Sequence, residues 1–355
     1  MTEAVAKRTG ETVSDRAEPA VTHVASPVAT FAGRALGSGI QLSVTLLDDR
    51  PDSADGVGGA GDPTGVAAWA EVLDELAQVD AALSRFRDDS ELTELNRRAG
   101  SGGSVAVSSR LRVALAICRR AQRVTDGRFD AGMLDVLERI GEHGATLAAS
   151  SAATSTRARP RAEPAAAARA VVPVPPRPVD LGGIGKGLAL RWAAARAIRC
   201  VPPGAGILLD AGGDLIATGR APAGGWLVGI EDPVAADPGT SEPLAVVALD
   251  RTAIATSSVR VRRWTAPDGS AVHHLLDPRT RQPAQTGLIA VTVAASDPAW
   301  AEIWSKALFL AGSRAIGEEA RSRGLAAWWV DDRGRIGMTP AARIRTAWAA
   351  ETRLG

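Results

Sequence analysis

A short glycine-rich segment carries the first chemical signal in this sequence. Residues 180–187 read Asp-Leu-Gly-Gly-Ile-Gly-Lys-Gly and precede an apolar stretch with the spacing of a helix. Glycines at a helix start let backbone amides approach a ligand closely, and such amides favour phosphate. The segment is not a Walker A loop, because Gly187 stands where Ser or Thr should follow Lys186, and the dinucleotide fingerprint does not fit either. It predicts a phosphate-binding turn, with a purely structural turn as the alternative.

Other short motifs lie on both sides of this segment. They are Leu83-Ser-Arg-Phe86, Ser90-Glu-Leu92 with Leu95-Asn96, Gly127-Arg-Phe-Asp130, Ala211-Gly-Gly-Asp214, Ile230-Glu-Asp-Pro233, Ala255-Thr-Ser257 and His274-Leu-Leu-Asp-Pro278 with Arg279 and Thr280. Each motif alone is a weak signal, but their order along the chain makes coincidence improbable. Together with residues 180–187, they resemble the motifs of the ApbE family over about residues 34–325.

The resemblance implies an FAD:protein FMN transferase. Such an enzyme cleaves the pyrophosphate of FAD, attaches FMN through a phosphoester to a Ser or Thr of an acceptor flavoprotein, and releases AMP. Two alternatives stay open. One is an FAD pyrophosphatase, in which water replaces the acceptor hydroxyl, and the other is a non-catalytic FAD-binding protein. All three would bind FAD.

The resemblance also assigns site residues one by one. His274 is the expected catalytic base, because it matches the family histidine and an imidazole titrates near neutrality, whereas His273 is expected on the opposite face of a strand. Among the FAD contacts, Phe86 offers a ring for stacking and Lys186 a charge for phosphate. The complete set of expected FAD contacts is Leu36, Phe86, Arg128, Phe129, Asp130, Asp180, Lys186 and Leu275.

The implied cofactor is Mg²⁺, held by the carbonyl of Gly183 and by side chains at positions 302 and 306, one helical turn apart. Glu302 keeps a carboxylate, but Lys306 stands where the family has Thr, and an ammonium cannot ligate a metal. Either Mg²⁺ binds with water in place of the lost ligand, or the ammonium supplies part of its charge. A surface pair of Glu302 and Lys306 is the structural alternative. Two further departures, Gly185 and Ser258, remove no reacting group, and Ser258 is expected to narrow the acceptor channel.

These residues need a framework of helices and strands. Apolar residues at helical spacing predict helices over residues 69–83, 111–124 and 300–310. Short runs bounded by Gly, Pro and Asp predict strands over 39–47, 206–210, 226–230, 244–249, 288–294 and 325–330. Because helices and strands do not alternate regularly, we expect an α+β fold of the ApbE type, with mixed or antiparallel sheets flanked by helices. The active site is expected between the two halves.

Composition sets the boundaries of this domain. Residues 1–28 lack periodicity and predict a disordered leader, and residues 29–355 predict one transferase domain with a low-complexity insertion at about 145–178. The net charge of +1 gives no reason to expect nucleic acid as a partner. No apolar run reaches the ~20 residues that a membrane span needs, so we expect no stable membrane insertion. The N-terminus lacks the apolar core of a signal peptide, which predicts a cytoplasmic location, with action outside the cytoplasm as the alternative.

Overall fold

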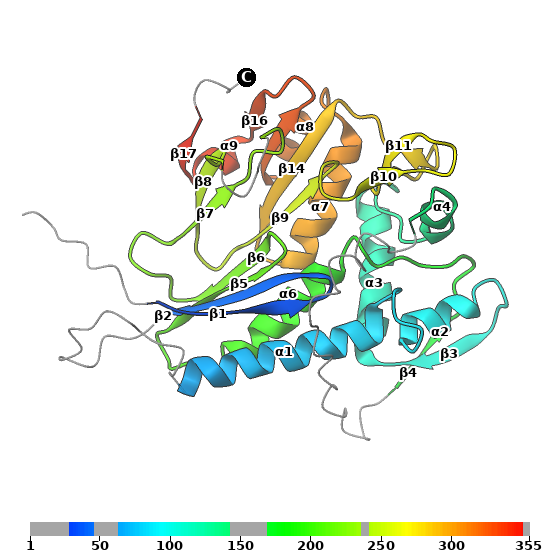
Figure 1. Cartoon of the computed structure of the whole chain (residues 1–355), viewed down its shortest axis with the longest axis horizontal. Coiled ribbons are helices and arrows are strands. Elements are labelled where there is room, and N and C mark those ends of the chain that lie inside the picture. The colour runs from blue at the N-terminus through cyan, green and yellow to red at the C-terminus, as the bar shows by residue number, and fades with distance from the viewer. Residues whose placement is uncertain (1–27, 46–62, 143–168, 236–240, 351–355) are drawn as a thin grey trace, which may run out of the picture.

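A computed structural model describes residues 28–45, 63–142, 169–235 and 241–350. Its centre is an eight-stranded sheet in which neighbouring strands run antiparallel (Figure 1). The β1–β2 and β5–β6 turns meet at one end of the sheet, where the amide of Gly212 donates to the carbonyl of Gly39 at 3.0 Å. The strand order is β1 (Val28–Ala35), β2 (Ser38–Thr45), β5 (Gly206–Ala211), β6 (Asp214–Gly219), β9 (Ala253–Ser258), β14 (Leu288–Ala295), β15 (Ala326–Asp331) and β16 (Ile336–Met338).

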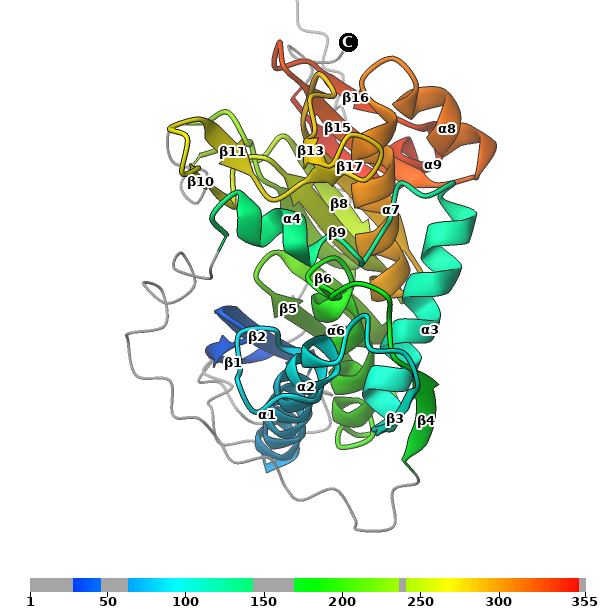
Figure 2. The ribbon, with the colours of Figure 1, turned by 90° about the vertical axis from the view of Figure 1, so that its right-hand side faces the viewer.

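Three helices cover one face of this sheet: α1 (Pro63–Leu83), α6 (Gly185–Ala197) and α7 (Pro298–Ala311) (Figures 1 and 2). The helix α1 buries the apolar residues that its spacing predicted, and it packs with α6 against β1, β2 and β5. The helix α7 packs against β9 and β14 further along the sheet. Strand β14 is buried on both faces, and its Val291 and Val293 point towards α7.

The opposite face of the sheet is covered by a second, three-stranded sheet. Its order is β17 (Thr346–Ala349), β8 (Ala245–Leu249) and β7 (Trp226–Ile230). Apolar side chains of the two sheets form one cluster, in which Trp226 and Val247 meet Trp328. Strands β6, β9, β14 and β15 therefore lie between a helical layer and a sheet layer, and this confirms the expected α+β class with antiparallel sheets.

Shorter elements surround these layers. The helix α3 runs beside the helical layer and joins the lower and upper parts of the molecule in Figure 2. Among the described residues, no helix has the length and apolar composition that crossing a bilayer requires. The remaining elements are α2 (Glu91–Arg97), β3 (Ser104–Val107), α3 (Ser109–Val124), α4 (Leu134–Arg139), β4 (Ala170–Pro173), β10 (Arg263–Thr265), β11 (Ala271–His273), β12 (Leu276–Asp277), β13 (Gln282–Pro283), α8 (Ile316–Ser322) and α9 (Pro340–Arg343).

Two of the expected low-complexity segments are only partly described. The leader expected at 1–28 lies outside the described residues except for Val28, which begins β1. The insertion expected at 145–178 extends too far towards the C-terminus, because residues 170–173 within it form β4 and pair with β3. Val172 is buried in the main core, and its side chain explains why this part folds despite its proline-rich neighbourhood. The rest of that insertion, up to residue 168, lies outside the described residues.

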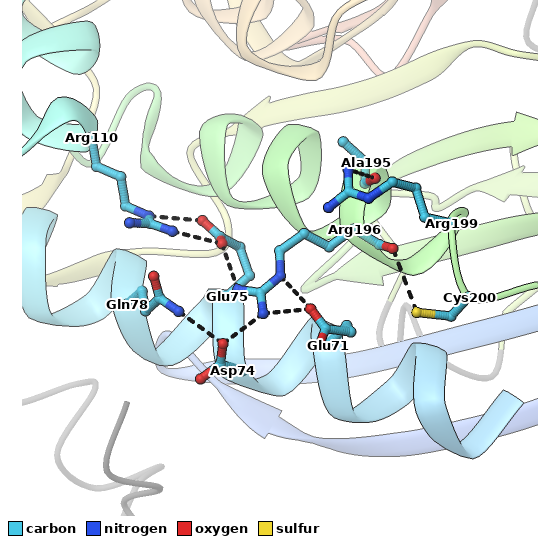
Figure 3. A network of polar contacts seen from close by, with 9 residues as sticks. All are labelled: Glu71, Asp74, Glu75, Gln78, Arg110, Ala195, Arg196, Arg199 and Cys200. Carbon is cyan, nitrogen blue, oxygen red and sulfur yellow. Dashed lines mark hydrogen bonds and ion pairs between the residues drawn. The ribbon is translucent and has the colours of Figure 1, made fainter. Parts of the chain in front are cut away.

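A polar network ties α6 to α1 and α3 (Figure 3). The guanidinium of Arg196 on α6 contacts Asp74 at 2.6 Å and Glu75 at 2.9 Å, and it also pairs with Glu71. Arg110 at the start of α3 reaches the same Glu75 at 2.7 Å. Networks of several charges hold helices in register better than isolated surface pairs do. The C-terminal part of α6 is therefore anchored to the helical layer, and its amino end points away from this anchor.

The amino end of α6 is set by a close approach to α7. A methyl group placed on Gly187 would lie 2.5 Å from the Cα atom of Ala299 and 2.6 Å from the carbonyl oxygen of Pro298. Only glycine allows the two backbones to come this close, because neither backbone atom can turn aside. At Gly185, two residues earlier on the same turn, an added methyl group would meet no heavy atom within 4 Å.

We expect Gly187→Ala to lower the free energy of unfolding by about 1–3 kcal/mol, because the new methyl group overlaps the backbone of α7. Gly185→Ala is the matched control, and it should be neutral or stabilise by about 0.5–1 kcal/mol because Ala favours a helix over Gly. Urea unfolding followed by circular dichroism measures both. Equal stability of the two variants would contradict the assigned role of Gly187.

Candidate active site

A cavity of about 310 Å³ lies where the central sheet opens between β6 and β9. These two strands pair at only two positions, Leu215 with Ile254 and Ile216 with Ala253. Beyond that point the cavity extends from the helical face of the sheet to the face covered by β7 and β8. Four of the residues expected from the sequence line it: Lys186, His274, Glu302 and Lys306.

The glycine-rich turn brings the start of α6 to this cavity. The amide of Gly185 donates to the carbonyl of Leu181 at 2.8 Å, which closes the turn before the helix. Gly182 lines the cavity, and the amide of Gly187 donates to Glu302 Oε2 on α7 at 2.8 Å. The positive end of a 13-residue helix therefore faces the cavity, as an anion site requires.

Lys186 forms a short ion pair with Asp214, the first residue of β6. Burial lowers the pKa of Lys186, but the carboxylates of Asp214 and Glu302 outweigh this effect, and the pKa is raised overall. The amide of Thr256 on β9 donates to Asp214 Oδ1 at 3.0 Å. The carboxylate thus takes the place of the backbone carbonyl that would accept from this amide if β6 and β9 continued to pair. Sequence analysis did not assign Asp214 to the site, although it belongs to the Gly-Gly-Asp motif that signalled it.

Lys306 reaches the glycine-rich turn from α7. A methyl group placed on Gly183 would lie 2.5 Å from Lys306 Nζ and 3.0 Å from Phe129 Cε2. The ammonium lies 6.0 Å from the centre of the Phe129 ring. Burial lowers the pKa of Lys306, while Asp180 and Glu302 act in the opposite direction. Lys306 Nζ thus lies beside Gly183, and the roles of both residues towards a metal stay predictions.

Glu302 stands one turn before Lys306 and is buried. Burial, followed by the charge of Asp214, raises the pKa of Glu302 to about 7, against the opposing effect of Lys186. The pair of Glu302 and Lys306 is therefore not an exposed surface pair, and the structural alternative expected from the sequence is wrong. Both side chains belong to the cavity wall.

His274 faces the cavity from the segment after β11. Its Nδ1 atom lies 3.3 Å from the carbonyl oxygen of Arg262 and therefore donates the hydrogen bond. Burial and the nearby charges of Arg262 and Lys306 hold the pKa of His274 well below its usual range. The imidazole is neutral at neutral pH, and its Nε2 atom carries the free lone pair. His273 does not line the cavity and instead packs its ring against Phe309, with 6.5 Å between ring centres.

Two arginines that were not expected from the sequence, Arg85 and Arg262, meet beside the cavity, and Arg262 lines it. Glu142 is buried and pairs with Arg262 at 2.5 Å and, more closely, with Arg85. Arg85 Nε also lies 3.0 Å from Asp180 Oδ1, so the expected site residue Asp180 is held by this cluster. Arg85 belongs to the Leu-Ser-Arg-Phe motif, but nothing in the sequence signals Glu142 or Arg262, because they come from loops far apart in the chain.

The other expected FAD contacts lie around the cavity and not in its wall. Phe86 is 46% exposed, and the guanidinium carbon of Arg85 lies over its ring, 4.1 Å from the ring centre. Leu36 has a positive φ of 51° in the β1–β2 turn. Phe129 is buried, and its ring lies beside both Gly183 and Lys306. Leu275 is fully buried in the core between the sheet and α7.

Arg128 and Asp130 make contacts within the protein. Arg128 pairs with Glu319 on α8 at 3.1 Å. Asp130 accepts from the amide of Gly132 at 2.8 Å and pairs with Arg177 at 3.3 Å. These contacts place both side chains outside the cavity wall. Their roles towards FAD stay predictions.

Ser258 lines the cavity at the end of β9. Its expected effect, to narrow the acceptor channel, stays a prediction. Its hydroxyl accepts from the amide of Arg260 at 3.2 Å, so it is turned into the local backbone. Four cationic side chains, four carboxylates, a neutral imidazole and a helix amino end therefore surround one space. This arrangement can bind a polyanion such as a pyrophosphate and can remove a proton from a nucleophile beside it.

Comparisons with known proteins show which sequences and folds this chain resembles. The sequence model of the ApbE family matches residues 38–329. A Haemophilus influenzae protein named FAD:protein FMN transferase is 25% identical over 314 residues, which cover 85% of this chain and 86% of that protein. A Treponema pallidum protein of the same name is 30% identical over 268 residues, covering 69% and 72%. The crystal structure of apo Pseudomonas stutzeri flavinyl transferase ApbE has the same fold, with a TM-score of 0.68 at 23% identity, covering 92% of this chain and 99% of that one.

We expect Glu142→Gln to destabilise the protein by about 3–5 kcal/mol, because two largely buried guanidinium groups lose the carboxylate between them. Glu138→Gln is the matched control, because Glu138 is exposed on α4 four residues earlier. The control should change stability by less than about 0.5 kcal/mol. Thermal unfolding of both variants is the measurement, and an equal melting temperature would show that the buried cluster does not depend on Glu142.

Proposed function

This chain belongs to the ApbE family, and on that premise we propose that it is an FAD:protein FMN transferase. The proposed acceptor is a Ser or Thr of a partner flavoprotein, and the second product is AMP. Support comes from the activity named for the relatives and from the match of this chain to most of their length. The site chemistry described above supports the same reaction independently of these names.

One observation carries the proposal: a neutral imidazole and four cationic groups line a single cavity beside the amino end of α6. Transfer of FMN needs charge offset on the pyrophosphate oxygens and removal of a proton from the acceptor hydroxyl. Lys186, Arg262 and Lys306 are placed for the first task. His274 is placed for the second.

The proposed step balances without any further reactant. The acceptor oxygen forms a bond to the phosphorus of the FMN half, while the bond between this phosphorus and the bridging oxygen breaks. AMP leaves with the bridging oxygen and its negative charge. The hydroxyl proton passes to Nε2 of His274, because Nδ1 already donates to the carbonyl of Arg262. The resulting imidazolium can return the proton to solvent.

Mg²⁺ stays a prediction from the family resemblance, and the residues at its expected place do not fit a divalent cation. Lys306 places an ammonium against Gly183, whose carbonyl was the expected ligand. Glu302 Oε2 already accepts a hydrogen bond from the amide of Gly187. Within the described ranges, no group of three or more His, Cys, Asp or Glu side chains has an arrangement that could hold a metal. No step proposed here runs through a metal, and the cytoplasmic location likewise stays a prediction.

His274→Ala should lower the rate of covalent FMN transfer by about 10²–10⁴-fold, because the acceptor hydroxyl loses its base. FAD affinity should stay within about threefold, since a base acts on the acceptor and not on bound FAD. His273→Ala is the control, because this neighbouring ring lies outside the cavity wall. Release of AMP, free FMN and protein-bound flavin is measured with and without an acceptor protein.

The products of this assay also separate the alternatives. AMP with free FMN and no protein-bound flavin would indicate an FAD pyrophosphatase. FAD binding without AMP would indicate a binding protein. Transfer by His274→Ala at the wild-type rate would remove His274 from the mechanism.

The pH dependence of kcat/KM gives a separate test. Because the pKa of His274 is lowered well below 6.5, the base stays deprotonated down to that pH and loses activity only when the pH falls through the lowered pKa. We therefore expect a constant kcat/KM from pH 8 to about 6.5 and a decline on further acidification. A midpoint at or above about 6.5 would contradict the burial of His274 as the cause.

A further inference from the structure

The ammonium of Lys306 differs from Lys186 and Arg262, the other cations of the cavity that are not exposed, in having no ion pair among the described residues. Lys186 pairs with Asp214, and Arg262 pairs with Glu142. In the part of the chain that the structure describes, Lys306 Nζ has no carboxylate oxygen within 4.0 Å and makes no hydrogen bond. Its neighbours are Gly183 and the ring of Phe129. A charged group that lines a cavity without a partner is available to a ligand of opposite charge.

The composition of the chain gives a second, independent observation. Of its 41 Lys and Arg residues, only Lys7, Lys186 and Lys306 are lysine. Both lysines within the described residues line the same cavity. Everywhere else in that part of the fold, including positions 260 and 262 of the same cavity, the chain uses arginine as its cation, so lysine at positions 186 and 306 marks a requirement of these two places. An ammonium is compact, whereas a guanidinium is planar and wider.

The surroundings of Lys306 explain this requirement. The Nζ atom fills the space beside Gly183, where even one added methyl group would lie at 2.5 Å. Phe129 closes the same space from the other side, at 3.0 Å from that methyl position. A guanidinium at position 306 would have less room between these two neighbours than an ammonium has. The place next to the turn is therefore shaped for a small cation carried by the chain.

We propose that the ammonium of Lys306 is a built-in cation that contacts the pyrophosphate of FAD and takes the place of a divalent metal ion. The inference rests on the proposed function, because it assumes that FAD is the ligand of the cavity. Lys306 sits between the glycine-rich turn and Glu302, next to the amino end of α6, where a bound pyrophosphate would meet backbone amides and Lys186. The pyrophosphate supplies the anionic partner that Lys306 lacks within the protein. FAD binding and FMN transfer then need no added divalent cation.

The test measures FAD affinity by flavin fluorescence in a chelator and in millimolar Mg²⁺. Wild type should bind FAD with the same affinity in both conditions, within about twofold, and should show no Mn²⁺ binding in a paramagnetic titration. Lys306→Met and Lys306→Gln should weaken FAD binding in the chelator by about 10- to 100-fold, because they remove a charged contact at nearly unchanged length. Two neutral variants are used so that a folding defect in one leaves the other informative.

Arg314→Met is the matched control for the loss of one positive charge. Arg314 is exposed just after α7 and lies outside the cavity wall. This variant should keep wild-type FAD affinity. Unchanged FAD affinity in both Lys306 variants, or Mn²⁺ binding by the wild type together with FAD binding that disappears in the chelator, would overturn the inference.

The outcome is distinct from that of the proposed function. FAD binding by the wild type without covalent transfer to any acceptor would refute the transferase proposal, while the affinities of the Lys306 variants would still decide the inference. FMN transfer that stops in the chelator and returns with Mg²⁺ would confirm the transferase and overturn the inference. Transfer that continues in the chelator and falls in Lys306→Met confirms both.

Discussion

The contact between the first turn of α6 and the amino-terminal half of α7 determines the geometry of the cavity. Gly187 lets the two backbones approach, and its amide is bound by Glu302. This contact brings Lys186 at the start of α6 and Lys306 on α7 to the same cavity. Because α7 also packs on β9 and β14, and α6 is anchored to α1 through Arg196, the positions of both lysines depend on the whole helical layer.

The cavity exists because the central sheet is interrupted. Strands β6 and β9 pair at two positions and then separate, so the space that a continuous sheet would fill is open to both faces. Asp214 compensates for the lost pairing by accepting the amide of Thr256. The same carboxylate then pairs with Lys186. Asp214 thus binds a backbone amide where the strands of the sheet separate, and it also orients Lys186 in the site.

Charge balance explains how so many ionisable groups share a confined space. Buried charges are costly unless they are paired, and most of the site obeys this rule. Glu142 holds two arginines, and Asp214 holds Lys186. His274 avoids the cost by staying neutral, as its lowered pKa indicates. Lys306 is the exception, and its ammonium faces the cavity beside Gly183.

The sequence by itself determined several of the main helices and strands and the motif residues. Apolar spacing predicted α1, α3 and α7, because a helix buries every third or fourth residue whatever its partner is. The motifs identified the glycine-rich turn, His274, Glu302 and Lys306, because these residues lie within short contiguous patterns. Only the tertiary structure revealed the ion pair of Glu142 and Arg262 at the cavity, since these residues are 120 positions apart in the chain. It alone also decided the surroundings of Lys306, because the space beside Gly183 is set by packing between segments that no local pattern relates.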